Sequence, residues 1–163
     1  MSKRLFAAAA LIALVAAGGL FLVNQKTPVP LVQGSSLSGQ LIDTQALKGK
    51  PYLVNFWATS CVTCVKEMPD LKALQTQFAP QGFSILAVAM AYDKPEFIER
   101  FAQERELPFV FLHDRDGRWA RAFGDVAVTP TTFLVDAQGQ MIKRYVGQPD
   151  FKQLNGLIQS LLK

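Results

Sequence analysis

The sequence predicts an α/β domain with a mixed central sheet and helices on both of its faces. Two observations carry this prediction. Short, continuous apolar runs such as Tyr52–Trp57 and residues 83–90 are typical of strands that are buried on both faces. Segments with apolar residues at helical spacing separate these runs. Half of the 163 residues are apolar, so the chain is long enough for one such domain and an additional segment.

The first segment, residues 1–23, is predicted to be a short cytoplasmic stub and a transmembrane helix. Residues 5–23 contain no polar side chain, and as a helix at ~1.5 Å per residue they would span roughly 28 Å, close to the ~30 Å hydrocarbon core of a bilayer. The run exceeds the ~7 to 15 residues of a signal-peptide core. We therefore favour an uncleaved anchor over a cleaved signal peptide or a buried core helix.

The orientation of this anchor follows from Lys3 and Arg4, which precede it. By the positive-inside rule these two charges stay in the cytoplasm. We expect a single-pass protein of the bacterial inner membrane whose catalytic domain lies in the periplasm, or on the outer face of the membrane.

A linker and one folded domain are expected after the anchor. Residues 24–31 are polar and rich in proline, which predicts a linker, and the domain is expected at residues 32–163. Five strands are expected, at Tyr52–Trp57, residues 83–90, residues 109–112, Thr131–Val135 and Gln140–Val146. The sequence DAQG at residues 136–139 predicts a hairpin turn between the last two.

Helices are expected between these strands and after the last one. After the first strand, Met68, Leu71, Leu74 and Phe78 recur on one helical face. After the second strand, Asp93 is expected to cap a helix with Glu96 as its capping-box partner. A shorter helix is expected around residues 119–123, and a closing helix from about residue 149.

The charge distribution excludes a nucleic-acid partner. The chain has 17 basic and 13 acidic residues and a net charge of +4, and two of the basic residues are Lys3 and Arg4. The remaining surplus is spread without clusters, whereas phosphate binding needs a concentrated basic face.

Cys61 and Cys64 are the only cysteines, and they stand three positions apart in WATSCVTCVKEMP. A disulfide across two intervening residues closes too small a loop to restrict the unfolded chain much, which argues against a purely structural role. Cys61 follows the first strand and precedes a helix, where backbone N–H groups and the helix dipole stabilise a thiolate. Cys64, one turn further on, faces the same side and can resolve a mixed disulfide by a second exchange.

Metal binding is the alternative reading of this pair. Two thiolates at this spacing can hold Cu(I), so a copper-binding module remains open. Zinc is a poorer fit because only His113 is left to join the cysteines, and in HDRDG this histidine is expected in an exposed turn. Thiol-disulfide exchange itself predicts neither a metal nor a cofactor.

Pro130 opens an apolar run in VTPTTFLVD, a position where proline disrupts strand pairing. A cis bond between Thr129 and Pro130 would leave the Thr129 backbone free to pair with a substrate strand. An ordinary trans proline at the start of an edge strand is the alternative.

Together, WATSCVTCVKEMP and VTPTTFLVDAQG resemble the membrane-anchored TlpA/ResA-like branch of the thioredoxin superfamily, from about residue 41 to the C-terminus. The resemblance implies a thioredoxin-like fold and a thiol-disulfide oxidoreductase that acts on proteins. It assigns Cys61 as the attacking thiol and Cys64 as the resolving thiol. It also implies that Pro130 is cis and lies opposite the cysteines.

The same resemblance suggests further site residues. Glu67 matches an acidic residue beneath the active site and is expected to take part in catalysis, and Pro69 matches a proline that bends the motif helix. We expect Thr129, Pro130 and Trp57 to bind the substrate.

The chain departs from its relatives at Ser60 and at Val62 with Thr63, next to the cysteines. Asn55 stands where thioredoxin has an acid, so proton transfer is expected to pass through Glu67 or water.

The reaction implied by the resemblance is the reduction of disulfides in envelope proteins. Cytochrome c haem-site cysteines and copper-site cysteines of oxidase assembly factors are the substrate classes that it suggests. A chain with one predicted span and no further cysteine cannot relay electrons across the membrane by itself. We therefore expect a membrane-embedded electron donor as a partner, besides the substrate proteins.

Overall fold

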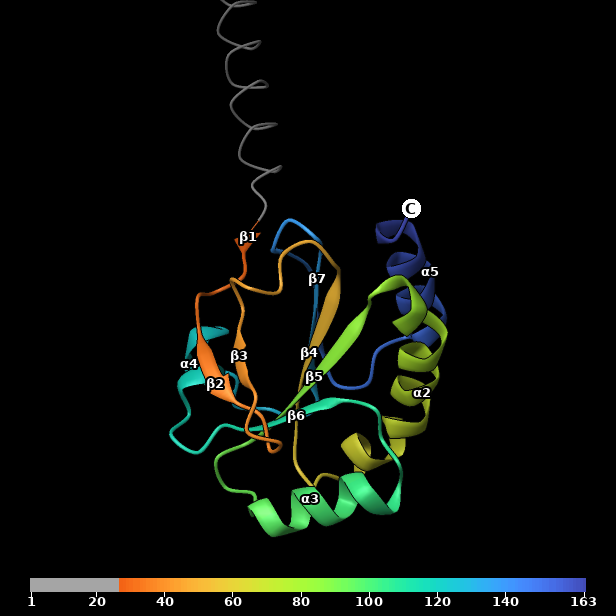
Figure 1. The fold of residues 1–163 in the computed structure, drawn as a ribbon. Coiled ribbons are helices and arrows are strands. Elements are labelled where there is room, and N and C mark those ends of the chain that lie inside the picture. Colours follow the sequence, from red (N-terminus) through yellow and green to blue (C-terminus); the bar gives the residue numbers. More distant parts are fainter. Residues whose placement is uncertain (1–26) are drawn as a thin grey trace, which may run out of the picture.

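The computed structural model describes residues 27–163 (Figure 1). Its strands are β1 (Thr27–Pro28), β2 (Gln33–Ser35), β3 (Leu41–Asp43), β4 (Tyr52–Trp57), β5 (Ser84–Ala89), β6 (Val110–His113), β7 (Thr131–Val135) and β8 (Gln140–Val146). Its helices are α2 (Val62–Phe78), the 3-10 helix η1 (Ala79–Gln81), α3 (Pro95–Glu104), α4 (Arg118–Ala122) and α5 (Phe151–Leu161). The predicted anchor at residues 5–23 lies outside the described residues. Within residues 27–163, no helix combines the length and the apolar composition that crossing a bilayer requires.

The main sheet has six strands in the order β1-β8-β7-β4-β5-β6. β4 pairs with β5 in parallel and β5 pairs with β6 in parallel, whereas β7 runs antiparallel to both β4 and β8. The predicted mixed sheet and the five predicted strands are thus confirmed, with ends that differ by one residue at β5 and β6. Because β4 is central, all six of its residues are buried, which explains why all but Asn55 are apolar or aromatic.

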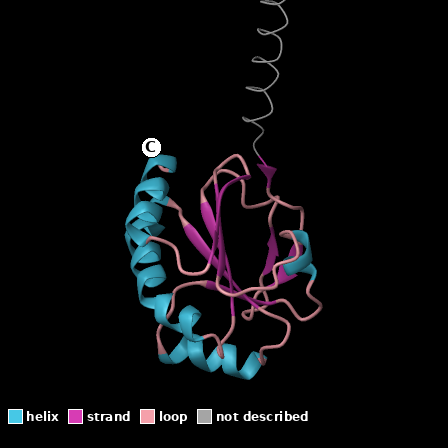
Figure 2. Cartoon of the chain, turned by 180° about the vertical axis from the view of Figure 1, so that it is seen from behind, coloured by secondary structure: helices cyan, strands magenta, loops and turns pink. Residues whose placement is uncertain are grey.

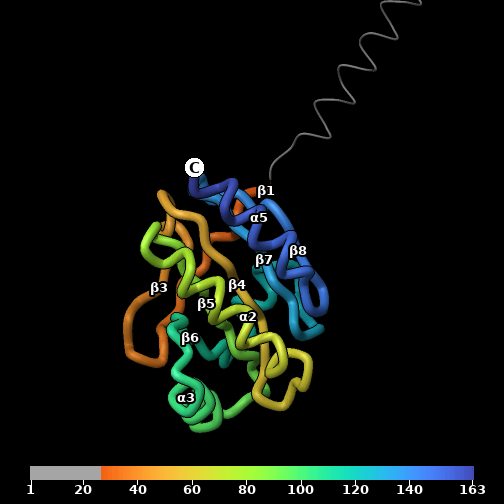
Figure 3. Tube along the Cα trace, turned by 90° about the vertical axis from the view of Figure 1, so that its right-hand side faces the viewer, coloured from red at the N-terminus to blue at the C-terminus, as the bar shows by residue number. Residues whose placement is uncertain are grey.

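Helices cover both faces of the sheet. Figure 1 shows α2 and α5 on one side and α4 with the β2–β3 hairpin on the other, and Figure 2 shows the same layers from behind. From the side, α2 and α5 run next to each other (Figure 3), joined by a hydrogen bond of 2.8 Å from Asn155 to Gln77. One apolar cluster lies beneath α2, α3 and α5, and a second lies on the opposite face beneath α4 and the hairpin.

The predicted linker extends too far into the folded domain. Thr27 and Pro28 pair with Met141 and Gln140 of β8, and the side chain of Val29 is buried in the second cluster. The prediction was wrong here because a two-residue strand has no periodicity by which it could be recognised. The fold therefore begins no later than residue 27.

The predicted capping role of Asp93 is also wrong. α3 begins at Pro95, and its N-cap, Lys94, makes no side-chain capping bond. The carboxylate of Asp93 accepts hydrogen bonds from the Thr59 backbone N–H at 2.6 Å and from the Thr59 hydroxyl at 2.7 Å. It therefore ties the loop after β4 to the loop after β5.

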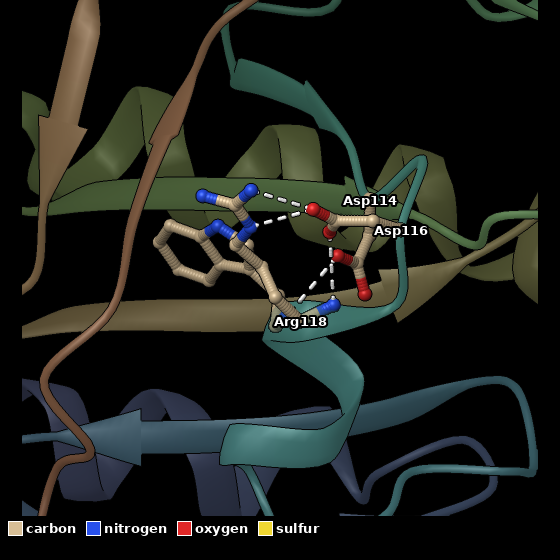
Figure 4. A network of polar contacts seen from close by, with 4 residues as sticks. Asp114, Asp116 and Arg118 are labelled. Atoms are coloured by element: carbon tan, nitrogen blue, oxygen red, sulfur yellow. Dashed lines mark hydrogen bonds and ion pairs between the residues drawn. The ribbon is translucent and has the colours of Figure 1, made fainter.

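The turn after β6 is shaped by Asp114 rather than by His113. Asp114 is buried and accepts from the backbone N–H groups of Trp119 and Ala120, at 3.0 and 2.8 Å, at the start of α4. Figure 4 shows Asp114 in this turn beside Asp116 and Arg118, whose side chains bond to each other. His113 is the last residue of β6, and neither ring nitrogen, both of them buried, has a partner among the described residues. The expectation of an exposed turn histidine is corrected accordingly, because the strand continues one residue further than predicted.

Candidate active site

Cys61 and Cys64 lie at the start of α2, directly after the central strand. β4 ends at Trp57, and Cys61 is the N-cap of α2, with its sulfur accepting from the backbone N–H of Cys64 at 3.2 Å. The two cysteines form a disulfide with a Cα–Cα distance of 5.2 Å. Cys61 is partly exposed and Cys64 is fully buried. A partner thiol can therefore approach Cys61 but not Cys64.

Pro130 lies at the same end of the sheet. Phe56 pairs with Thr131 across β4 and β7, so the residue before β7 is next to the point where β4 leads into the cysteine loop. The bond from Thr129 to Pro130 is cis, which confirms the expectation. The Pro130 carbonyl accepts from Gly147 at 2.8 Å, and the Thr131 hydroxyl donates to the Val128 carbonyl at 2.7 Å.

The Thr129 backbone stays available beside the disulfide. Thr129 is partly exposed, and its backbone groups have no hydrogen-bond partner anywhere in residues 27–163. An incoming extended segment could pair with them.

The position of Trp57 does not support its predicted contact with substrate. Trp57 is fully buried, and its ring packs against Phe101 and Phe111, with centroid distances of 5.1 and 5.8 Å. As the last residue of a central strand, it points into the layer between the sheet and the helices. Trp57 supports the cysteine loop from below and offers no surface to a partner.

Glu67 is buried in the layer directly beneath the disulfide. It follows Cys64 by three residues on α2, and both side chains have no exposed surface, so they lie on the same helical face. Its Oε1 accepts from Asn55 Nδ2 at 3.0 Å, and the same nitrogen donates to Thr132 Oγ1 at 2.9 Å. Glu67 is therefore not a solvated residue on the surface of the helix.

Thr132 belongs to this cluster although sequence reasoning did not identify it. Asn55 pairs with Thr132 across β4 and β7, so the two side chains point to the same face of the sheet. The available signal was a pair of threonines at the start of an otherwise apolar strand, Thr131 and Thr132. The register that brings Thr132 to Asn55 could not be read from the sequence.

The environment of Glu67 changes its acidity. Burial raises the pKa of Glu67 from its ordinary 4.5 to about 7, and the nearby carboxylate of Asp70 also raises it, while the hydrogen bond from Asn55 opposes the shift. The carboxyl therefore gains and loses its proton near neutral pH. This is the range in which a general acid or base is most effective.

The structure offers little for the metal alternative. Across residues 27–163, no three His, Cys, Asp or Glu side chains come together as a metal site. Cys61 and Cys64, the two sulfur ligands that copper would need, are bonded to each other. The geometry fits a redox-active pair.

Comparison with known proteins identifies the family. The model of the Redoxin family matches residues 23–158. The chain belongs to the Redoxin family. Among its relatives, thiol-disulfide oxidoreductase ResA from Bacillus cereus is 30% identical over 128 residues, covering 78% of this chain and 72% of the relative. Thioredoxin-like protein YneN from Bacillus subtilis is 32% identical over 168 aligned positions, covering 94% and 96%.

A solved structure agrees with this assignment. The solution structure of a putative thioredoxin from Neisseria meningitidis has a TM-score of 0.77 and 35% identity, covering 85% of this chain and 91% of that one. This Redoxin-family chain is thus a thiol-disulfide oxidoreductase with a thioredoxin-like fold, and Cys61 and Cys64 form its dithiol-disulfide pair. The copper-binding alternative is not favoured.

Proposed function

We propose that this Redoxin-family chain reduces disulfides in other proteins by two successive exchange reactions. The Cys61 thiolate attacks a substrate disulfide, forming a mixed disulfide and releasing one substrate thiolate. Cys64 then attacks the Cys61 sulfur, forming the Cys61–Cys64 disulfide and releasing the second thiolate. Two electrons pass from the dithiol to the substrate. The observation that carries this proposal is the asymmetry of the pair, with Cys61 partly exposed at the start of α2 and Cys64 fully buried.

Glu67 is proposed to move the proton that resolution requires. Cys64 becomes a nucleophile only after it loses its proton, and it has no exposed surface through which bulk water could remove it. Glu67, one turn away and with a pKa of about 7, accepts the proton from the Cys64 thiol and later returns it. In its ionised form Glu67 also disfavours a second negative charge nearby.

The substrate segment is proposed to bind beside Pro130. The free backbone groups of Thr129 favour an extended segment that pairs with them over one or two residues. Such pairing would place the substrate disulfide against the exposed side of Cys61.

The location and the partners of the enzyme are part of the same proposal. The apolar residues 5–23 after Lys3 and Arg4 support a single inner-membrane span with the catalytic domain in the periplasm. Confinement near the membrane raises the effective concentration toward a membrane-embedded electron donor, which would keep the pair reduced. The substrates are then envelope proteins with disulfides, including the cytochrome c and copper-site cysteines suggested by the resemblance.

The test is a substrate trap in cells that express the full chain. Cys64→Ser is expected to hold substrate proteins on Cys61 as reductant-sensitive adducts, which mass spectrometry identifies, and the matched control Cys61→Ser should hold none. Acid quenching and thiol alkylation then give the steady-state redox state of the wild-type pair. A pair that is mainly oxidised, and equally so when candidate donors are deleted, would contradict the reductase direction.

A further inference from the structure

The hydrogen bond between Asn55 and Glu67 leaves one oxygen on each side chain unused. Glu67 Oε1 accepts from Asn55 Nδ2, but Glu67 Oε2 and Asn55 Oδ1 are both buried and have no partner among the described residues. An unsatisfied buried polar atom costs about 1–3 kcal/mol. Because the two side chains are already joined by one hydrogen bond, a proton shared between Glu67 Oε2 and Asn55 Oδ1 would satisfy both atoms.

We propose that Asn55 is a positioning residue that holds protonated Glu67 as a two-point acid–amide pair. In this pair Glu67 Oε2–H donates to Asn55 Oδ1, while Asn55 Nδ2 continues to donate to Glu67 Oε1. Thr132 Oγ1 accepts the other Nδ2 proton and holds the amide in place. The proposal rests on the proton-accepting role of Glu67 proposed above.

The orientation of the amide follows from its two neighbours. Asn55 Nδ2 lies 3.0 Å from Glu67 Oε1 and 2.9 Å from Thr132 Oγ1. An oxygen in that position would face the ionised carboxylate without a proton between them. The amide nitrogen Nδ2 therefore faces Glu67 Oε1. The amide oxygen Oδ1 can accept a hydrogen bond from Glu67 only when the Glu67 carboxyl is protonated.

An asparagine serves both protonation states of Glu67, which neither an aspartate nor an apolar residue could do. Its N–H group stabilises the carboxylate, and its carbonyl stabilises the carboxylic acid. An aspartate at position 55 would repel ionised Glu67. A leucine there would leave both carboxyl oxygens of Glu67 without a hydrogen-bond partner. Asn55 thus keeps the carboxyl group in one geometry while its proton comes and goes.

The proton in this pair comes from Cys64. Glu67 Oε2 takes the proton from the Cys64 S–H group, and the Cys64 thiolate then attacks the Cys61 sulfur of the mixed disulfide. The Cys61–Cys64 bond forms as the bond from Cys61 to the substrate sulfur breaks, and the substrate sulfur leaves as a thiolate. Asp70, on the same helix, is the charged group that acts on Glu67. Tyr145 on β8 lies on the far side of Thr132, and Asp150, the N-cap of α5, acts on Tyr145. Tyr145 pairs with Thr132 across β7 and β8, and burial and Asp150 raise its pKa, so it stays protonated when Glu67 titrates.

The test is a side-chain NMR titration of the oxidised full chain, labelled with ¹³C and ¹⁵N at Asn and with ¹³C at Glu. The chain has asparagines only at positions 24, 55 and 155, so few signals must be assigned. A carbonyl carbon moves downfield when its oxygen accepts a hydrogen bond. We expect Asn55 Cγ to move downfield as the pH falls through about 7, with the same midpoint as Glu67 Cδ. Asn155, which bonds to Gln77 at the surface, should not move and is the internal control.

Glu67→Gln is the decisive variant because its amide imitates the protonated acid. The N–H group of the introduced amide can donate to Asn55 Oδ1 at every pH, so Asn55 Cγ should stay at its low-pH position throughout the titration. An upfield movement of Asn55 Cγ on protonation of Glu67, or a Glu67→Gln variant that matches the high-pH position, would overturn the two-point pair.

Variants of Thr132 test its part in holding the amide. Thr132→Val removes the acceptor that holds Asn55 Nδ2 in place, so the hydrogen bond from Nδ2 to the Glu67 carboxylate should weaken. We expect the titration midpoint of Glu67 to rise by about half a pH unit, the effect of a partly lost hydrogen bond. Thr132→Ser keeps the hydroxyl and should keep the wild-type midpoint. Equal midpoints in the Val and Ser variants would overturn the role of Thr132.

The outcomes for the pair and for the enzyme are separable. If Asn55 Cγ does not respond while the Cys64→Ser trap still captures substrates, the pair is refuted and the proposed function stands. If Asn55 responds as expected but no substrate is trapped, the pair stands and the proposed function fails.

Discussion

Replacing Glu67 by Gln tests whether the fold favours the protonated form of this buried carboxyl. Burial raises the pKa of Glu67 from 4.5 to about 7 in the folded chain, whereas the unfolded chain keeps the ordinary value. Below pH 4.5 the carboxyl is protonated in both states, and above pH 7 it is ionised in both. Between these values only the folded chain holds the proton, so the stability of the wild type falls as the pH rises.

The size of this effect follows from the shift. Each pKa unit corresponds to about 1.4 kcal/mol, so the wild type is expected to lose about 3 kcal/mol between pH 4.5 and pH 7. Glu67→Gln carries no proton that titrates at this position and should not lose this contribution. The difference between the two stabilities, wild type minus variant, should fall by about 1.4 kcal/mol per pH unit in this window and stay constant above it.

Urea unfolding of the oxidised full chain at intervals from pH 4 to pH 8.5 measures this difference, in which the other titrating groups cancel. Glu104→Gln makes the same chemical change at an exposed position of α3 and is the matched control, for which a constant difference is expected. If the Glu67→Gln difference is also constant, within an extrapolation error of about 10–15%, the fold does not favour the protonated carboxyl and the reasoning is wrong.

Three further predictions concern the cysteines, the contact between Asp93 and Thr59, and the N-cap of α5. Cys64 should be alkylated more slowly than Cys61 in the reduced chain, because it is fully buried, and mass mapping that finds Cys64 modified first would reverse the assigned roles. Asp93→Asn removes one of the two oxygens that accept from Thr59 and should lower the free energy of unfolding in urea by about 1–3 kcal/mol. Hydrogen exchange of the Thr59 amide should become faster. Unchanged exchange there would show that the contact does not hold the loop. Asp150→Ala removes the N-cap bond of α5, at 3.0 Å from the Gln153 N–H, and should cost about 1 kcal/mol in the same assay, so equal stability would contradict the capping role.

Local patterns were enough to predict five of the six strands of the main sheet and the position of the cysteines. Tyr52–Trp57 is apolar except for Asn55, and Thr131–Val135 is apolar after its two threonines, because both strands are central and buried on both faces. The place of Cys61 at the junction of strand and helix could be predicted for the same reason, since the end of one pattern and the start of the next are both visible in the sequence. The chemistry of the pair depends on that junction.

Contacts between distant residues could not be predicted in this way. Asn55 lies 12 positions before Glu67 and 77 positions before Thr132. Only the register of β4 with β7 and the packing of α2 on the sheet bring the three side chains together. Asp93 had a local sequence typical of a helix cap, but its carboxylate bonds to Thr59, 34 positions away.

By itself, the sequence determined the α/β pattern and the reactive pair, because strand burial, helix periodicity and the spacing of two cysteines are properties of neighbouring residues. Only the tertiary structure decided that Trp57 is buried away from any partner and that Glu67 is buried next to an amide. The acidity of Glu67 is also decided by the tertiary structure. Its pKa depends on how much water the surrounding elements exclude, and that quantity exists only once the chain has packed.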